Sequence, residues 1–244
     1  MRYCFVIPNY NHIENLAAQI TALAKHGLTI FMVNDGSDLQ VKSDLEALTA
    51  QEPLLTLLHH ETNQGKGGAV QTGLTYALAE GFDYAIQVDA DGQHCLDDIP
   101  ALIALSQQFP HSVISGKPVY DDSIPKLRYL ARYITHFWVI IETLSTSLKD
   151  TMCGFRVYPL KPSVALLDNV AIGKRMDFDI EILVRLYWRG VRTQFIETNV
   201  IYPQNGISHF KAFEDNVRIS WMHTKLCFGM LLRLPILIAR KFKQ

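Results

Sequence analysis

Four short apolar runs in the first half of the chain each end in a polar or glycine-rich cluster. The clusters read PNYN, NDGSD, NQGKGG and DADGQ, and segments with helical spacing of apolar residues separate them. Alternation of strands and helices is typical of a mostly parallel sheet covered by helices. In such sheets ligands bind beyond the carboxyl ends of the strands. The sequence therefore predicts an α/β fold with a binding site at one edge of its sheet.

The periodicity also predicts where the individual elements lie. We expect strands at 3–7, 28–33, 54–58 and 84–88, with helices around 16–24, 41–48 and 70–78 between them. Beyond residue 115 we expect a polar loop, SGKPVYDDSIPK, then a long amphipathic helix at 127–148, a strand at 153–159, a helix at 177–189 and a strand at 195–202. We find no repeat or linker. We therefore expect one domain over 1–216, followed by a basic apolar helical tail at 217–244.

The DADGQ cluster places two carboxylates, Asp89 and Asp91, directly after an apolar run. Oxygen ligands at this spacing suit Mg²⁺ or Mn²⁺ shared with the phosphates of a nucleotide, and Gln93 can add a carbonyl oxygen. The alternative interpretation of the same residues is an ordinary Asp-Gly turn at the end of a strand. An EF-hand is excluded, because His94 and Pro100 stand where that loop needs glycine and glutamate.

Three further clusters each have a functional and a structural interpretation. NQGKGG, with Lys66 and Gly67, matches neither standard nucleotide fingerprint; it indicates either anion binding at a helix start or a tight turn. In NDGSD, Asp35 can accept hydrogen bonds from a nucleobase or ribose, or the segment is a turn with a helix cap. In MDFDIEIL, Asp177 and Glu181 share one helix face and Asp179 points elsewhere. Asp177 is a candidate general base, or these charges complement the helix dipole.

Taken in order, PNYN, VNDGSD, NQGKGGAVQTG, VDADGQH, CGFRVYP and MDFDIEIL resemble the motifs of family 2 glycosyltransferases. The likeness covers about residues 3–210 and is greatest to dolichyl- or polyprenyl-phosphate mannose and glucose synthases. The resemblance implies a GT-A fold, which is a Rossmann-like three-layer sandwich. It also implies inverting transfer of a sugar from a UDP- or GDP-sugar to an acceptor.

The resemblance assigns site residues by position. It implies a metal site for Mg²⁺ or Mn²⁺ at Asp89, Asp91 and Gln93, and catalytic roles for Asp91 and, as base, Asp177. The donor would contact the residues at the strand ends, namely Pro8, Tyr10, Asn11, Asp35, Lys66, Gly67, Asp89, Ala90 and Asp91.

The chain also departs from the synthases, mostly where they carry positive charge. His12 replaces a glutamate of the first motif, Lys117 an arginine, and Pro203 and His209 the basic ends of a late loop. The hypothesis that follows is a lipid or lipid-linked acceptor offering a hydroxyl; a polyprenyl-phosphate glycosyl synthase is the alternative. The candidate acceptor contacts are Lys117, Arg128, Arg132, Ser208 and His209. Alternatives of another class are a sugar-phosphate nucleotidyltransferase and a non-catalytic sugar-nucleotide binding module.

Composition bears on partners and location. A formal net charge of −1 gives no field that favours nucleic acid, and four separated cysteines indicate reduced thiols in a cytosolic setting. The tail mixes apolar bulk with arginine and lysine, which suits a helix lying on a membrane surface or one packed on the core. We expect a cytoplasmic enzyme, peripheral on the inner face of the cytoplasmic membrane, that makes a cell-envelope glycolipid.

Overall fold

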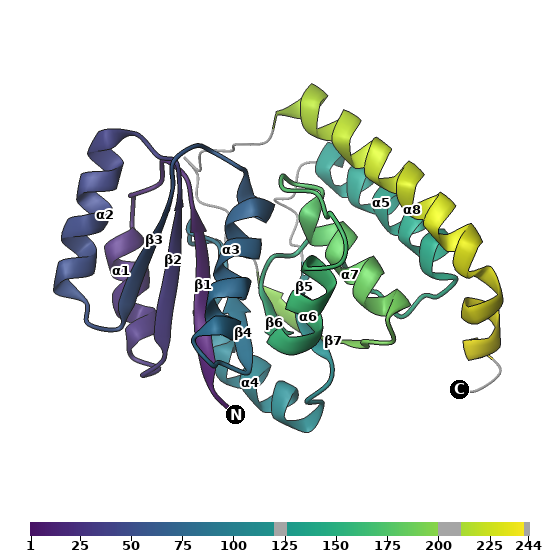
Figure 1. Cartoon of the computed structure of the whole chain (residues 1–244), viewed down its shortest axis with the longest axis horizontal. Coiled ribbons are helices and arrows are strands. Elements are labelled where there is room, and N and C mark those ends of the chain that lie inside the picture. The colour runs from purple at the N-terminus through teal and green to yellow at the C-terminus, as the bar shows by residue number, and fades with distance from the viewer. Residues whose placement is uncertain (120–125, 200–210, 242–244) are drawn as a thin grey trace.

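A seven-stranded sheet of order β3-β2-β1-β4-β6-β5-β7 forms the centre of the computed structural model (Figure 1). The structure describes residues 1–119, 126–199 and 211–241. The strands are β1 (Tyr3–Asn9), β2 (Thr29–Asp35), β3 (Leu55–His60), β4 (Tyr84–Gln87), β5 (Val113–Val119), β6 (Arg156–Pro159) and β7 (Thr193–Asn199).

All pairings in the sheet are parallel except those of β6. β6 runs antiparallel to both of its neighbours, β4 and β5, and its first residue, Arg156, pairs with Gln87, the last residue of β4. The start of β6 therefore lies at the same edge as the carboxyl ends of the other strands. This reversal brings the CGFR segment to the edge where the site is expected.

Helices cover both faces of the sheet, because successive side chains of a strand point to opposite faces. Phe5 and Ile7 of β1 pack in one apolar cluster with α1 (Leu16–Ala24), α2 (Leu39–Gln51) and α4 (Ile99–Gln108), which follows a short 3₁₀ turn, η1 (Leu96–Asp98). Cys4 and Val6 pack in the other with α3 (Lys66–Ala79), α6 (Leu160–Leu167) and α7 (Phe178–Trp188). The three-layer α/β arrangement predicted from the sequence is confirmed.

Two long helices extend the second layer at one end of the molecule. α8 (Ala212–Lys241) packs along α5 (Lys126–Thr143) and α7, and lies at the opposite end from α2 (Figure 1). At their interface, His223 Nδ1 lies 2.7 Å from Glu142 Oε1, and the Trp188 indole donates to the Glu142 carbonyl at 2.8 Å. α8 begins at Ala212, so the expected boundary at residue 216 falls inside a helix.

The first four strands and their helices match expectation within a few residues, but the second half differs. The first five residues of the expected polar loop, SGKPV, belong to the strand β5. Their glycine and proline predict a loop, but pairing with β7 stabilises them as a strand. The strand expected at 153–159 is confined to β6, and the long helix stops at Thr143 because Leu144 adopts a positive φ of 50°. β7 covers 193–199, and α4 and α6 were not predicted.

Candidate active site

Three charged side chains from separate elements meet at the carboxyl edge of the sheet. Asp89 follows β4, Lys66 is the first residue of α3, and Asp179 lies in the first turn of α7. Lys66 Nζ lies 2.8 Å from Asp89 Oδ2 and 2.9 Å from Asp179 Oδ2. Since both helices start here, their N-termini add partial positive charge to the same region. The result is an acidic centre bridged by one ammonium group.

The charges shift one another's pKa values. Burial acts to raise the pKa of Asp89, but the Lys66 ammonium and its hydrogen bond outweigh it and lower that pKa to about 2. Burial acts to lower the pKa of Lys66, but Asp179 and Asp89 raise it above its usual value. Burial, and then the Asp89 charge, raise the pKa of Asp91. The ionised form of Asp91 is therefore disfavoured at this centre.

Close packing fixes the orientation of Asp89. Gln87 Nε2 donates to Asp89 Oδ1 at 3.3 Å, and the Asp89 backbone N–H donates to His94 Nδ1 at 3.2 Å. A Cβ atom at Gly154 would lie 2.7 Å from Gln87 Nε2 and 2.8 Å from both Asp89 Oδ2 and Lys66 Nζ. A glycine before Phe155 is thus what lets the CGFR segment pass beside the charged centre.

Arg156 is the buried support beneath this centre. It has no exposed surface; its guanidinium donates to the Asp179 carbonyl at 2.7 Å, the Thr151 carbonyl at 2.8 Å and the Tyr158 hydroxyl at 3.1 Å. These bonds tie the start of α7 and the loop before β6 to the sheet. The arginine therefore positions Asp179 through its backbone.

Asp35 organises the loop before α3. It is 1% exposed, and it accepts hydrogen bonds from the backbone N–H groups of Gln64 at 2.8 Å and Gly65 at 2.7 Å. His60 Nδ1 lies 2.7 Å from the same carboxylate, and its Nε2 lies 2.9 Å from the Thr72 hydroxyl. Asp35 thus holds the backbone that presents Lys66, and its role towards a nucleobase or ribose stays a prediction.

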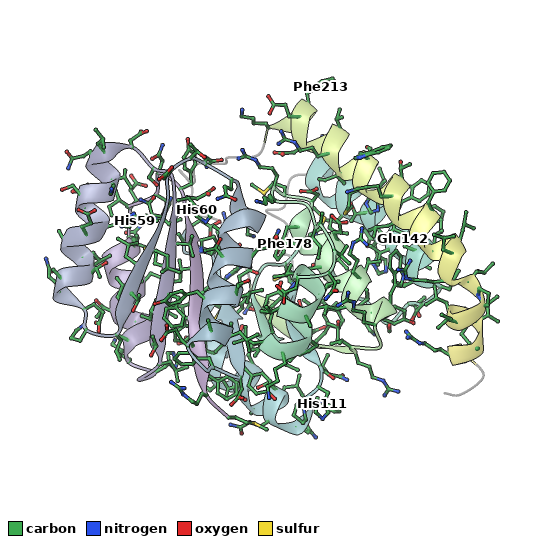
Figure 2. All side chains as sticks on the ribbon, in the orientation of Figure 1. His59, His60, His111, Glu142, Phe178 and Phe213 are labelled. Atoms are coloured by element: carbon green, nitrogen blue, oxygen red, sulfur yellow. The ribbon has the colours of Figure 1, made fainter. Side chains whose placement is uncertain are left out.

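The remaining predicted donor contacts surround this edge. Pro8 is buried in β1, and Asn11 ties the loops after β1 and β2 together by accepting from the Asp38 backbone N–H at 2.8 Å. Tyr10 and Ala90 also lie at this edge. Gly67 leaves space for Phe178, whose Cβ would lie 2.3 Å from an added Cβ there, and Figure 2 places Phe178 at the centre of the molecule. The Gln93 backbone N–H donates to Asp91 Oδ1 at 3.1 Å.

Asp177, the predicted base, faces a different segment from Asp179. It occupies the N-cap position of α7, although its side chain makes no capping hydrogen bond, and it is 7% exposed. It accepts from the Arg175 backbone N–H at 3.1 Å, while Glu181 accepts from the Gly173 N–H at 2.8 Å. Asp177 and Glu181 thus share the side of α7 that faces the turn before it, as the helical spacing predicts. Burial raises the pKa of Asp177.

A cavity of about 280 Å³ lies between the end of β5 and α5, beside the candidate acceptor contacts. Its lining includes Lys117, Arg132, His136 and Lys149 together with Asp150. Lys117 pairs with Glu197 at 3.1 Å, and Arg132 with Asp150 at 2.5 Å. The side chain of Arg128, and the whole of Ser208 and His209, lie outside the described residues.

Sequence reasoning missed the roles of Asp179, Arg156 and Gly154. Helical spacing places Asp179 on a different face of its helix from Asp177 and Glu181, and this difference indicates that Asp179 faces another element. CGFR was recognised as a motif, but only the antiparallel direction of β6 shows that it reaches the site edge.

The oxygen ligands present suit a hard divalent cation. Asp89 already holds one positive group on Oδ2, and Asp91 is half-buried nearby with a raised pKa, a pair that a cation would stabilise. The described residues contain no group of three or more His, Cys, Asp or Glu side chains that forms a ready-made cage. Asp89, Asp91 and the nearby Gln93 thus fit a site that a diphosphate completes.

Comparison with known proteins identifies the family. The fold is that of a GT-A glycosyltransferase, and residues 4–162 match the model of glycosyl transferase family 2. The chain belongs to this family and is a glycosyltransferase. It is 25% identical over 216 residues to the undecaprenyl-phosphate mannosyltransferase of Micrococcus luteus, covering 86% of this chain and 87% of the relative. It is 34% identical over 195 residues to the UDP-N-acetylglucosamine–dolichyl-phosphate N-acetylglucosaminyltransferase of Methanococcus voltae, covering 73% and 77%.

Solved structures agree on the fold. Glucosyl-3-phosphoglycerate synthase from Mycobacterium tuberculosis superposes with a TM-score of 0.66 at 14% identity, covering 93% of this chain and 80% of that one. S. aureus TarS 1-349 in complex with UDP-GlcNAc gives a TM-score of 0.61 at 16% identity, covering 93% and 66%. In the match to another structure of S. aureus TarS 1-349, this chain covers 58% of the length of that protein. At sequence identities this low, the likeness shows that the fold is shared and nothing more.

Proposed function

We propose that this glycosyltransferase moves a sugar from a nucleoside-diphosphate sugar to a lipid-linked acceptor at a membrane surface. The observation that carries the proposal is the Asp89–Lys66–Asp179 centre, with Asp91 beside it, at the carboxyl edge of the sheet. Asp89, Asp91 and Gln93 would hold Mg²⁺ or Mn²⁺, which when bound supplies charge stabilisation for the departing diphosphate. The N-termini of α3 and α7 favour the same anion.

The reaction we infer is a single in-line displacement at the anomeric carbon, with inversion. Lys66 and the helix N-termini stabilise the leaving group, and the fixed Asp89 orients the donor. An acceptor phosphate is already anionic and needs no base. A hydroxyl acceptor needs one, and Asp177, whose pKa is raised, is the predicted candidate.

Polyprenyl phosphate is the acceptor class that the named relatives support. The cavity lined by Lys117, Arg132 and Lys149 would receive its phosphate. A specific observation favours the second candidate, a lipid hydroxyl: Lys117 and Arg132 are paired with Glu197 and Asp150, which reduces the positive charge offered to a phosphate. Both candidates are lipids, and both place the enzyme on a membrane.

Product analysis tests the reaction class and the acceptor together. Purified protein with Mn²⁺ is incubated with UDP- and GDP-sugars and either polyprenyl phosphate or the matching polyprenol. We expect release of nucleoside diphosphate and a lipid-linked sugar, with polyprenyl phosphate the faster acceptor. A parallel incubation with nucleoside triphosphate and sugar 1-phosphate tests the other class: release of pyrophosphate there would mean nucleotidyl transfer. Binding of donor without turnover would mean a non-catalytic module. A faster reaction with polyprenol would select the hydroxyl candidate.

The membrane part of the proposal rests on the outer face of α8. Its exposed apolar residues follow steps typical of one helix face, opposite Met222, Leu226 and Met230, which are buried. Four of them are 64–83% exposed: Phe213, Trp221, Phe228 and Leu232. Phe213 lies at the start of the helix and points away from the body (Figure 2). α5 adds exposed Tyr133, Ile134 and Phe137.

α8 is also long and apolar enough to cross a membrane by length and composition alone, and 28% of that stretch is buried. One face packs on α5 and α7: Arg240 donates to the Tyr187 and Trp188 carbonyls at 3.0 and 2.9 Å, and Arg233 lies 4.7 Å from the Trp188 ring centre. A helix attached along one side and apolar on the other suits a position lying in the membrane interface.

Replacing Trp221, Phe228 and Leu232 together with serine should therefore release the protein from vesicles. Each apolar side chain buried in lipid contributes roughly 1.5–3 kcal/mol, so binding should fall more than tenfold. Flotation with vesicles containing anionic lipid measures it, and circular dichroism checks the fold. The control is Leu39→Ser, an 86% exposed leucine at the start of α2. Equal flotation of the triple variant and the control would remove α8 from the membrane contact.

A further inference from the structure

Lys66 is held between two carboxylates that belong to different elements. Its ammonium lies 2.8 Å from Asp89 Oδ2 and 2.9 Å from Asp179 Oδ2, and its side chain is only 20% exposed. The space around it is tight, because a Cβ at Gly154 would come within 2.8 Å of Nζ. The lysine thus occupies an oxygen of the first carboxylate of the Asp89–Asp91 pair, where a divalent cation would also bind.

The two carboxylates are unequally satisfied. Asp89 accepts from Gln87 on Oδ1 and from Lys66 on Oδ2. Asp179 holds Lys66 on Oδ2, but its buried Oδ1 has no hydrogen-bond partner among the described residues, and Arg156 Nη1 stays 3.7 Å away. A buried polar atom without a partner is costly, so Asp179 has capacity for a further donor. An ammonium already touching its other oxygen has only a short distance to move.

We propose that Lys66 is a built-in counter-cation that competes with the divalent metal for Asp89, and that Asp179 is the positioning residue that takes it over when the metal binds. The inference rests on the proposed function, because it presupposes metal binding at Asp89 and Asp91. Without metal, Lys66 holds Asp89 in place through its 2.8 Å contact and offsets part of the negative charge of a centre that contains three carboxylates. When a second cation arrives at Asp89, like charges repel, and Lys66 moves onto Asp179. This residue lies in the first turn of α7, beside the N-terminus of α3, where a diphosphate would be bound.

The competition can be measured without turnover. Full-length protein is titrated with Mn²⁺ alone, without nucleotide, and free Mn²⁺ is followed by electron paramagnetic resonance. Lys66→Met removes the competing charge and should tighten Mn²⁺ binding by about tenfold, the scale of one lost charge-assisted hydrogen bond. Asp179→Asn removes the alternative position of Lys66 and should weaken Mn²⁺ binding several-fold. The double variant, which loses one charge of each sign, should bind as tightly as Lys66→Met alone.

The double variant distinguishes transfer of Lys66 to Asp179 from a direct electrostatic attraction between Asp179 and Mn²⁺. If Asp179 acts only through space, its effect persists without the lysine and the two single effects add; additivity would overturn the proposal. Lys174→Met is the control, since that nearby exposed lysine pairs with the neutral Gln64 amide at 2.8 Å. It should leave Mn²⁺ affinity unchanged, and an equal gain there would also overturn the proposal.

Two failures can be told apart. If Mn²⁺ binds the wild-type protein and stimulates it, but Lys66→Met does not bind more tightly, the handover is wrong and the proposed function stands. If neither protein binds Mn²⁺, with or without nucleotide sugar, the proposed metal dependence fails as well. Circular dichroism of each variant confirms that the compared proteins are folded.

Discussion

Replacing Asp91 with asparagine should lower sugar transfer by about a hundredfold or more and leave the fold intact. Removal of one preorganised charge that stabilises developing negative charge costs on the order of a hundred- to a thousandfold in rate. In the proposed site Asp91 would hold the metal together with Asp89, and asparagine keeps its shape but not its charge. Release of nucleoside diphosphate at saturating donor measures the loss. Asp97→Asn, an exposed carboxylate of η1, is the control.

The same substitution should maintain or raise stability in metal-free protein. Burial and the Asp89 charge raise the pKa of Asp91, so folding disfavours its charged form. A carboxyl with a raised pKa costs stability above that pKa, and the cost disappears as pH falls through it. Thermal unfolding in chelator at neutral pH should show a melting temperature for Asp91→Asn equal to or above the wild type, with a gap that narrows on acidification. A clear drop would mean that Asp91 has a structural role.

The first half of the fold could be predicted from the sequence, because apolar runs, helical spacing and turn residues there all indicate the same strands and helices. Cys4 and Val6 face one apolar cluster while Phe5 and Ile7 face the other, as alternation requires. The second half was less predictable since its decisive feature is a pairing direction. Nothing in Arg156–Pro159 states that this strand runs antiparallel between β4 and β5.

The location of the candidate site could be predicted from the sequence, but most of its side-chain contacts could not. Strand-end clusters indicated the edge, and Lys66, Asp89 and Asp91 do lie there. The partner of Lys66 could not be read from spacing, because Asp177, Asp179 and Glu181 are all acidic and only the docking of α7 against α3 selects Asp179. Asp35 shows the converse, since a carboxylate with an expected ligand role is surrounded by hydrogen bonds from its own protein.

Replacing Arg156 with methionine should be among the most destabilising single changes in the chain, costing about 3–5 kcal/mol, as expected when one member of a buried charged network is removed. The side chain has no exposed surface, and its loss removes the hydrogen bonds that it donates to the Asp179 and Thr151 carbonyls. It also leaves the Asp179 carboxylate, which lies 3.7 Å from the guanidinium, with Lys66 as its one remaining ion-pair partner among the described residues. Urea unfolding followed by circular dichroism measures the loss.

Arg156→Lys should recover little of this stability. The guanidinium reaches carbonyls on α7 and on the loop before β6 from one fixed plane, whereas a lysine ammonium is a single point charge on a flexible stem. Arg189→Met is the matched control, because Arg189 caps the far end of α7 and donates to the Ala165 carbonyl from an exposed position; a change there should stay near 1 kcal/mol or below. If Arg156→Met unfolded at the same urea concentration as this control, the buried arginine would not be what holds the start of α7, and with it Asp179 and Lys66, against the edge of the sheet.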